Sequence, residues 1–133
     1  MKSTLAAAAL SAALVAPTAV FAASYTIDET HAHAAFRVSH LGFSHTLGQF
    51  KEISGTLEFD EANPTASSVS VTINTASVDS ANEARDEHLR KADFLNVDEF
   101  PTMTFTSTTV EVTGENTGNL PGDLTLLGVT KPV

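Results

Sequence analysis

Ser68-Val69-Ser70-Val71-Thr72-Ile73-Asn74 decides the fold class, because its side chains alternate strictly between polar and apolar. Successive side chains of a β-strand point to opposite faces of the sheet, so Val69, Val71 and Ile73 share one face. β-branched side chains also suit a pleated surface. The run therefore predicts a half-buried strand with one apolar face and one wet face.

The same alternation recurs on both sides of this run. It is seen at residues 34–39, 53–60, 102–106, 110–112 and 120–126. Several short strands with one apolar face predict an all-β, antiparallel fold. Such strands close either as a sandwich or as a barrel, and periodicity does not choose between them. Small residues such as Gly55 and Ala34 stand beside large ones on the apolar side, which favours the barrel because they leave room inside.

Turn-forming residues separate these runs. Glu61-Ala62-Asn63-Pro64 predicts a turn in which proline fixes the backbone, and the Gly- and Asn-rich residues 114–119 predict a second connection. Pro121-Gly122-Asp123 interrupts a set of leucines and predicts a bulge.

One segment departs from the strand pattern. Ser80-Ala81-Asn82-Glu83 has the spacing of a capping box, in which Ser80 and Glu83 satisfy each other's free backbone donors. Charged residues at helical spacings follow it. The segment predicts one short helix of two to three turns, inserted at residues 80–91.

Residues 1–23 have the layout of a secretory signal peptide. Lys2 gives a positive start, residues 5–15 are an apolar run, and small residues surround Ala22. The run is shorter than the roughly 20 apolar residues that a membrane-spanning helix needs. We expect cleavage after Ala22 or Ala23, a single mature domain at residues 24–133, a periplasmic location and no membrane span.

The composition excludes several functions. The 133 residues carry a net charge of −9 and no cysteine. Binding of nucleic acid needs clustered Lys and Arg, so no nucleic-acid partner is expected. The acidic balance also argues against electrostatic docking on anionic lipid head groups. Without cysteine there is no disulfide framework and no thiol chemistry.

Four separated motifs resemble the YceI-like family of polyisoprenoid-binding proteins. They are Tyr25-Thr26-Ile27-Asp28 with residues 36–42 and 48–50, Arg85-Asp86-Glu87-His88-Leu89-Arg90 with Asp93-Phe94, residues 100–105, and residues 124–133. They occur in order across essentially the whole mature chain. The resemblance implies an extended, lipocalin-like antiparallel β-barrel, often a homodimer, whose apolar tunnel holds an isoprenoid lipid or a quinone-like molecule. Chains of the family run on past the last motif, so we expect either a fragment of a longer gene product or a barrel that is incomplete at its C-terminus.

Burial of hydrocarbon is the chemistry that such a tunnel supplies. A polyprenyl chain gains about 0.8 kcal/mol for each CH₂ moved out of water, so it needs a dry cavity lined by alternate residues of several strands. The predicted lining is Ala34, Phe36, Val38, Ile53, Leu57, Phe59, Val69, Val71, Ile73, Met103, Phe105 and Leu126. The alternative is that these side chains fill a solid core. Arg37 and His40 are candidates for contact with the polar head group of the lipid.

A pair of histidines suggests a second function. His31 and His33 are two residues apart and would share one face of a strand. Two imidazoles at this spacing bind Zn²⁺ only when a third and usually a fourth ligand join them. The alternative function is thus a periplasmic metal-binding or stress-protective protein. In the simpler interpretation His31 and His40 make structural hydrogen bonds at a barrel rim.

Arg85, Asp86, His88 and Asp93 suggest a third function, an enzyme that acts on a lipid-like substrate by general acid–base chemistry. No G-x-S-x-G motif and no cysteine accompany them. We interpret them as a polar network that pins the helix to the barrel. The sequence therefore predicts a binding protein with no catalytic residues and no cofactor apart from its bound lipid.

Overall fold

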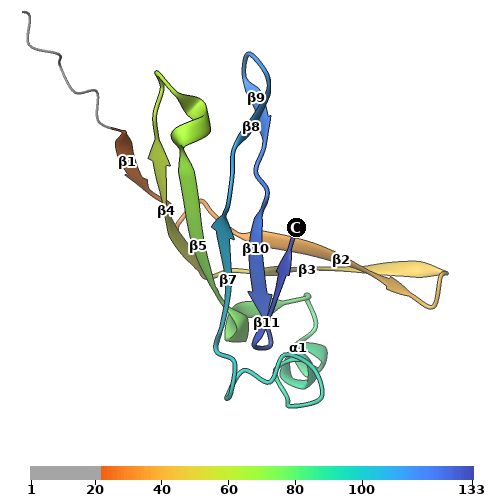
Figure 1. Ribbon diagram of the computed structural model, residues 1–133. Helices are drawn as coiled ribbons and strands as arrows, with labels where there is room; N and C mark the ends of the chain where they lie inside the picture. The colour runs from red at the N-terminus through yellow and green to blue at the C-terminus, as the bar shows by residue number, and fades with distance from the viewer. Residues whose placement is uncertain (1–21) are drawn as a thin grey trace, which may run out of the picture.

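The computed structural model describes residues 22–133, so the predicted signal peptide lies almost entirely outside the described residues. The chain is built mostly of antiparallel strands (Figure 1). The strands are β1 (Ala23–Thr26), β2 (Ala34–His40), β3 (Ser44–Phe50), β4 (Ile53–Phe59), β5 (Ser68–Asn74), β6 (Val78–Asp79), β7 (Thr102–Ser107), β8 (Glu111–Gly114), β9 (Thr117–Asn119), β10 (Gly122–Leu126) and β11 (Val129–Pro132). The helices are α1 (Glu83–Leu89) and the short 3₁₀ turns η1 (Pro64–Ala66) and η2 (Thr75–Ser77).

These strands form three sheets. The main sheet has six strands in the order β1-β4-β5-β7-β10-β11. β2, β3 and β6 form a second sheet, and β8 and β9 form a short ribbon. The β2–β3 hairpin runs across the main sheet and projects beyond it (Figure 1). Within residues 22–133 the strands do not close into a barrel.

The alternation predicted from the sequence sets the register of the main sheet. The run that decides the fold class is β5, with the predicted bounds. Ile73 pairs with Ile53 on one side and with Met103 on the other. Directly opposite residues share a face, so each apolar side chain of β5 continues a row across the sheet. The apolar face of the sheet follows from these rows.

The core lies where this face meets the second sheet. Its buried side chains are Phe50, Ile73, Val78 and Met103. Phe50 is the last residue of β3 and Val78 the first of β6, and these two residues pair in the second sheet. The core therefore joins both sheets through four side chains, and further apolar side chains that are half-buried pack against it.

Two glycines, Gly48 and Gly122, lie against aromatic rings. A Cβ atom built on Gly48 would lie 2.3 Å from the ring of Phe36, and one on Gly122 would lie 2.4 Å from the ring of Phe105. Both distances are far inside van der Waals contact. The room that these two glycines leave is thus taken up by rings of neighbouring strands. A Cβ atom built on Gly55 would lie 2.2 Å from the backbone oxygen of Ser70, so this glycine does not leave an empty space either.

The helix differs from the prediction at its start. Asn82 is the N-cap, and its side chain accepts a hydrogen bond of 3.0 Å from the backbone N–H of Arg85. The predicted capping box between Ser80 and Glu83 is wrong. Ala81 has a φ of 61°, and this turn places Ser80 outside the helix, where it bonds with Asp86 and Arg85 instead.

Two connections can be compared with their predictions. At the predicted bulge, Gly122 begins β10 in regular register with Ser107, but the carbonyl of Pro121 just before it accepts from the N–H groups of both Thr108 and Thr109, so the pairing is irregular at Pro121. A second irregular pairing lies in the β8–β9 ribbon, between Val112 and Gly114. The connection predicted at residues 114–119 is partly strand, since Thr117–Asn119 forms β9.

Candidate functional site

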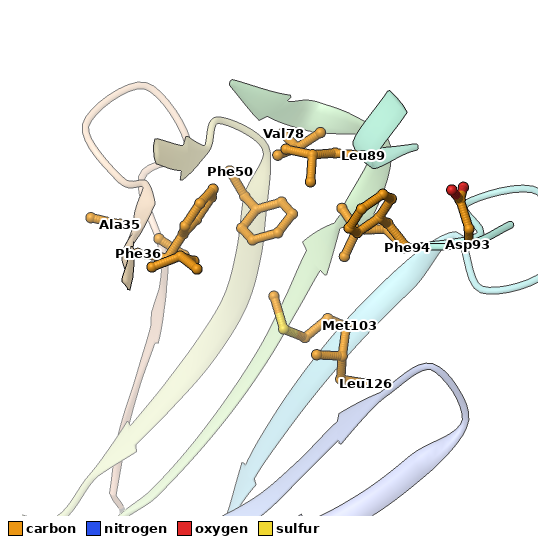
Figure 2. Close-up of a pocket in the computed structure, with 12 residues that line it drawn as sticks. Ala35, Phe36, Phe50, Val78, Leu89, Asp93, Phe94, Met103 and Leu126 are labelled. Carbon is orange, nitrogen blue, oxygen red and sulfur yellow. The ribbon is translucent and has the colours of Figure 1, made fainter. Parts of the chain in front are cut away.

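An apolar groove with a volume of about 640 Å³ lies between the second sheet, α1 and the main sheet. In Figure 2 Val78 and Leu89 lie above the space, Met103 and Leu126 lie below it, and the Phe36 and Phe50 rings lie beside it. It is lined by Ala34, Ala35, Phe36, Val38, Phe50, Val78, Leu89, Asp93, Phe94, Leu95, Met103 and Leu126. All but one of these side chains are apolar, so the groove favours a hydrocarbon ligand.

Each wall of the groove comes from a different part of the chain. The rings of Phe36 on β2 and Phe50 on β3 pack with their centroids 5.5 Å apart, within the usual range for aromatic pairs. Leu89 ends α1, and Phe94 follows it in the loop before β7. The helix and its loop thus form the wall that faces the hairpin.

Asp93 is the only charged residue of the groove lining. Its carboxylate lies 2.9 Å from Nε2 of His88, and the His88 ring meets the edge of Phe94 with centroids 4.8 Å apart. The hydrogen bond from His88 holds the pKa of Asp93 below its ordinary value of 3.8. The pair fixes the loop that carries Phe94 at the edge of the groove.

His88→Ala is expected to raise the pKa of Asp93 toward 3.8, because the bond that favours the carboxylate is lost. A lowered pKa in the folded state adds stability above the unfolded-state pKa, and this stability is lost as the pH falls through the lowered value. The variant should therefore lose less stability than the parent between pH 4 and the lowered pKa. NMR titration of the Asp93 carboxyl carbon in the parent and in the variant measures the shift.

A second, mostly apolar groove of about 460 Å³ lies between the β8–β9 ribbon and the ends of β4 and β5. Leu57, Phe59 and Val69 line it together with Val110, Val112 and Leu120. Val69 and Ile73 lie on the same face of β5, four residues or roughly 13 Å apart. Ile73 belongs to the core cluster with Phe50 and Met103, which line the first groove, so the apolar face of β5 runs from the second groove to this cluster.

The predicted tunnel residues divide among several surroundings. Ala34, Phe36, Val38, Met103 and Leu126 line the first groove, and Leu57, Phe59 and Val69 line the second. Ile73 is buried in the core and Val71 packs against it. Phe105 covers Gly122, and Ile53 also lines a more polar hollow beside Asn74 and Glu52. The structure thus brings together parts of the predicted set in two grooves and places the rest in the sheet between them.

Several residues that line the first groove were not predicted from the sequence. Phe50, Val78, Leu89, Phe94 and Leu95 were not among the predicted lining residues. Phe50 stands at the end of an alternating strand and carried a usable signal. The others lie on a two-residue strand, a helix end and a loop, where no period of two exists to reveal a shared face.

The two predicted head-group residues lie on opposite faces of the hairpin. In the β2–β3 register Arg37 pairs with Leu47 and His40 pairs with Ser44. Alternation places His40 on the face of Phe36 and Val38, and Arg37 on the other face. Of the two, only His40 shares the face of the strand that carries Phe36.

The predicted pairing of His31 and His33 on one strand face is wrong. Both residues precede β2, and His31 lies in a turn where Nδ1 is 2.6 Å from the Asp28 carboxylate. Thr30 binds the same carboxylate and helps to close this turn. Residues 22–133 hold no group of three or more His, Cys, Asp or Glu side chains placed to bind a metal ion.

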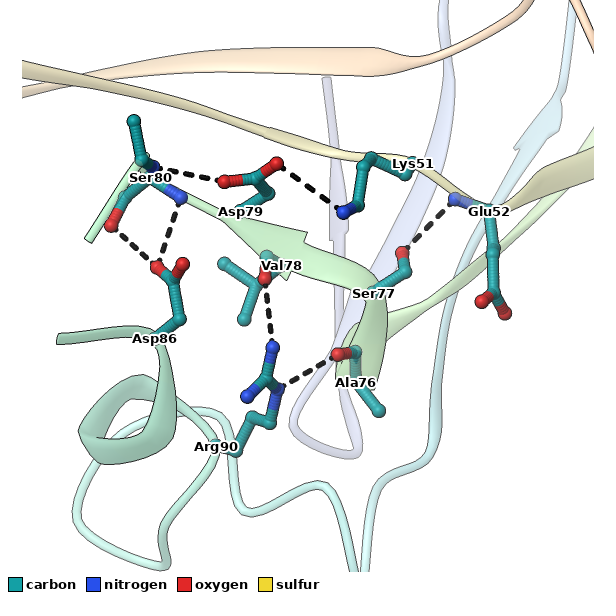
Figure 3. Close-up of polar contacts among 10 residues, drawn as sticks. Lys51, Glu52, Ala76, Ser77, Val78, Asp79, Ser80, Asp86 and Arg90 are labelled. Atoms are coloured by element: carbon teal, nitrogen blue, oxygen red, sulfur yellow. Dashed lines mark hydrogen bonds and ion pairs between the residues drawn. The ribbon is translucent and has the colours of Figure 1, made fainter. Parts of the chain in front are cut away.

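Arg85 and Asp86 form the predicted network that pins the helix. The Asp86 carboxylate accepts from the backbone N–H and the hydroxyl of Ser80, while Arg85 donates to the hydroxyl and the carbonyl of Ser80. Arg90 adds bonds of 2.9 Å to the carbonyl of Ala76 and 3.1 Å to that of Val78 (Figure 3). His88 and Asp93 instead pair with each other at the groove.

The fold and site define an antiparallel β-protein that exposes an apolar groove between two sheets. The chain belongs to the YceI-like family, because the YceI-like domain matches residues 25–133. A relative named UPF0312 protein, from Ectopseudomonas mendocina (strain ymp), is 54% identical over 135 residues, which cover 100% of this chain and 70% of the relative. The family predicted from the motifs is thus confirmed.

Solved structures show the same fold. The YCEI protein of Campylobacter jejuni superimposes with a TM-score of 0.63 at 38% identity, covering 82% of this chain and 64% of that protein. A polyisoprenoid binding domain from Saccharophagus degradans, implicated in plant cell wall breakdown, gives a TM-score of 0.52 at 17% identity, covering 85% of this chain and 60% of that domain. The chain therefore spans less than two thirds of these solved structures.

None of the helices in the described part of the chain is long and apolar enough to cross a membrane.

Proposed function

We propose that this protein binds a polyisoprenoid or a similar long-chain amphiphile and does not catalyse a reaction. The observation that carries the proposal is the lining of the first groove, where Asp93 is the only charged residue among twelve. Membership of the YceI-like family and the fold shared with a polyisoprenoid binding domain support the same ligand class. A quinone with a prenyl tail belongs to this class.

The two grooves suggest how a long chain would lie. A ligand that reaches both grooves has to extend at least about 13 Å along β5. In this proposal the two sheets act as facing walls of a lipocalin-like barrel around the hydrocarbon. The protein is exported after cleavage of residues 1–23, works in the periplasm and forms a homodimer; these three points are predictions from the signal-like leader and from the family.

Affinity should rise with chain length if burial of hydrocarbon drives binding. Each added CH₂ contributes about 0.8 kcal/mol, or roughly a fourfold lower Kd. The change in Kd per CH₂ can be measured by competition. Saturated alcohols of increasing length are titrated into the purified protein, and displacement of a dansyl-labelled farnesyl probe is followed by its fluorescence. A Kd that does not change with chain length would contradict the proposal. In a separate experiment, lipid is extracted from the purified protein and identified by mass spectrometry, which would name the ligand.

A further inference from the structure

The tip of the β2–β3 hairpin is the most exposed large apolar feature of the described residues. Phe43 is 94% exposed and Leu41 is 80% exposed. Both lie in the loop between β2 and β3, at the end of the hairpin that projects beyond the main sheet (Figure 1). Apolar side chains gathered at such a site mark a surface that contacts an apolar partner.

The backbone of this loop makes the leucine unusual. Leu41 and Gly42 both have positive φ, 54° and 78°, and the N–H of Phe43 donates to the carbonyl of His40 at 3.0 Å. Tight turns with this backbone favour Asn, Asp or Gly, because other side chains are strained there. The turn therefore displays an apolar side chain where local structure favours a polar one. Leu127 and Gly128 form a similar turn between β10 and β11, but Leu127 is only 36% exposed, so high exposure distinguishes the tip.

The charge of the hairpin differs from that of the rest of the chain. The chain holds 16 acidic residues, yet none occurs from residue 30 to residue 51. Arg37 makes no ion pair with any described residue, whereas Lys51 pairs with Asp79 at the base of the hairpin. Salt screens charges beyond about 8 Å under physiological conditions, so the acidic main sheet acts only weakly on an extended tip.

We propose that this tip docks on a bilayer surface that contains anionic lipid, with Leu41 and Phe43 inserted among the lipids. Arg37 lies about 13 Å from the turn along β2, which places its charge near the lipid phosphates when the tip enters by about 5–10 Å. The net charge of −9 opposes docking of most of the protein surface on anionic lipid. The hairpin tip, which carries no acidic residue, is therefore the part of the surface that contacts the bilayer. Val38, on the same hairpin, lines the first groove, so the docked tip would connect the bilayer to the groove.

Flotation with vesicles of phosphatidylcholine and phosphatidylglycerol tests the inference on the exported protein, after removal of residues 1–23. The parent protein should bind these vesicles. The double variant Leu41→Ser/Phe43→Ser should bind at least about tenfold more weakly, and Arg37→Gln should lose affinity for anionic vesicles but not for pure phosphatidylcholine. The matched control, Val129→Ser/Val133→Ser, removes exposed apolar side chains elsewhere and should bind like the parent.

Two results of the flotation experiment would overturn the inference: no vesicle binding by the parent, or equal binding by the parent and the tip variant. A dimer of the parent in sedimentation equilibrium that the tip variant abolishes would also overturn it, since the tip would then contact a second copy. Uptake of the dansyl-labelled farnesyl probe from solution, without vesicles, separates docking from ligand burial. The tip variant should take up the free probe normally, and a failure of the parent to take it up would count against the proposed function alone.

Discussion

Phe36→Arg is expected to weaken binding of a prenyl chain by about a hundredfold or more. Phe36 lines the first groove and packs against Phe50. An arginine there would be left facing hydrocarbon without a partner, and an unpaired charge removed from water costs several kcal/mol. About 3 kcal/mol corresponds to a hundredfold change in Kd. Displacement of the dansyl-labelled farnesyl probe measures the loss.

Two further variants make this result specific. Leu47→Arg places the same charge on the opposite face of the hairpin, where Leu47 is exposed and pairs with Arg37. It should bind the probe like the parent. Phe36→Leu keeps an apolar side chain in the groove and should lose far less affinity than Phe36→Arg. Equal binding by folded Phe36→Arg and Leu47→Arg would exclude the first groove as the ligand site.

The strands were predictable because each carries its own period of two. Residues 68–74 could be assigned to β5 without any knowledge of their neighbours, and the pairing of Ile53, Ile73 and Met103 follows once these apolar positions share a face. The family was predictable for a different reason, since its motifs are local stretches of sequence that the YceI-like domain also matches.

The groove was less predictable because its walls are not periodic. Val78 lies on a strand of two residues and Phe94 in a loop, so their positions depend on how α1 docks on the sheets. The start of α1 was also misassigned, since S-x-x-E fits a capping box but the turn at Ala81 gives Ser80 other partners. A local motif such as S-x-x-E forms only if tertiary contacts do not offer its residues better partners. The pattern of residue types does not reveal those contacts.

Asp86→Ala is expected to lower the free energy of unfolding by about 3 kcal/mol. Asp86 is 6% exposed and Ser80 is 5% exposed, so their hydrogen bonds are shielded from water. The substitution leaves the N–H and the hydroxyl of Ser80 without their acceptor, and a buried donor left unpaired costs about 1–3 kcal/mol. Urea unfolding followed by circular dichroism measures the change.

Glu87→Ala is the matched control, because it removes a carboxylate from the next position of the same helix, where the side chain is exposed. Its effect should stay within about 0.5 kcal/mol. Asp86→Asn keeps one acceptor oxygen and should lie between the two alanine variants. Since α1 and its loop carry Leu89 and Phe94 to the groove, Asp86→Ala should also weaken binding of the farnesyl probe under conditions where the protein stays folded. Equal stability of the two alanine variants would show that α1 is held by its apolar contacts and not by Ser80.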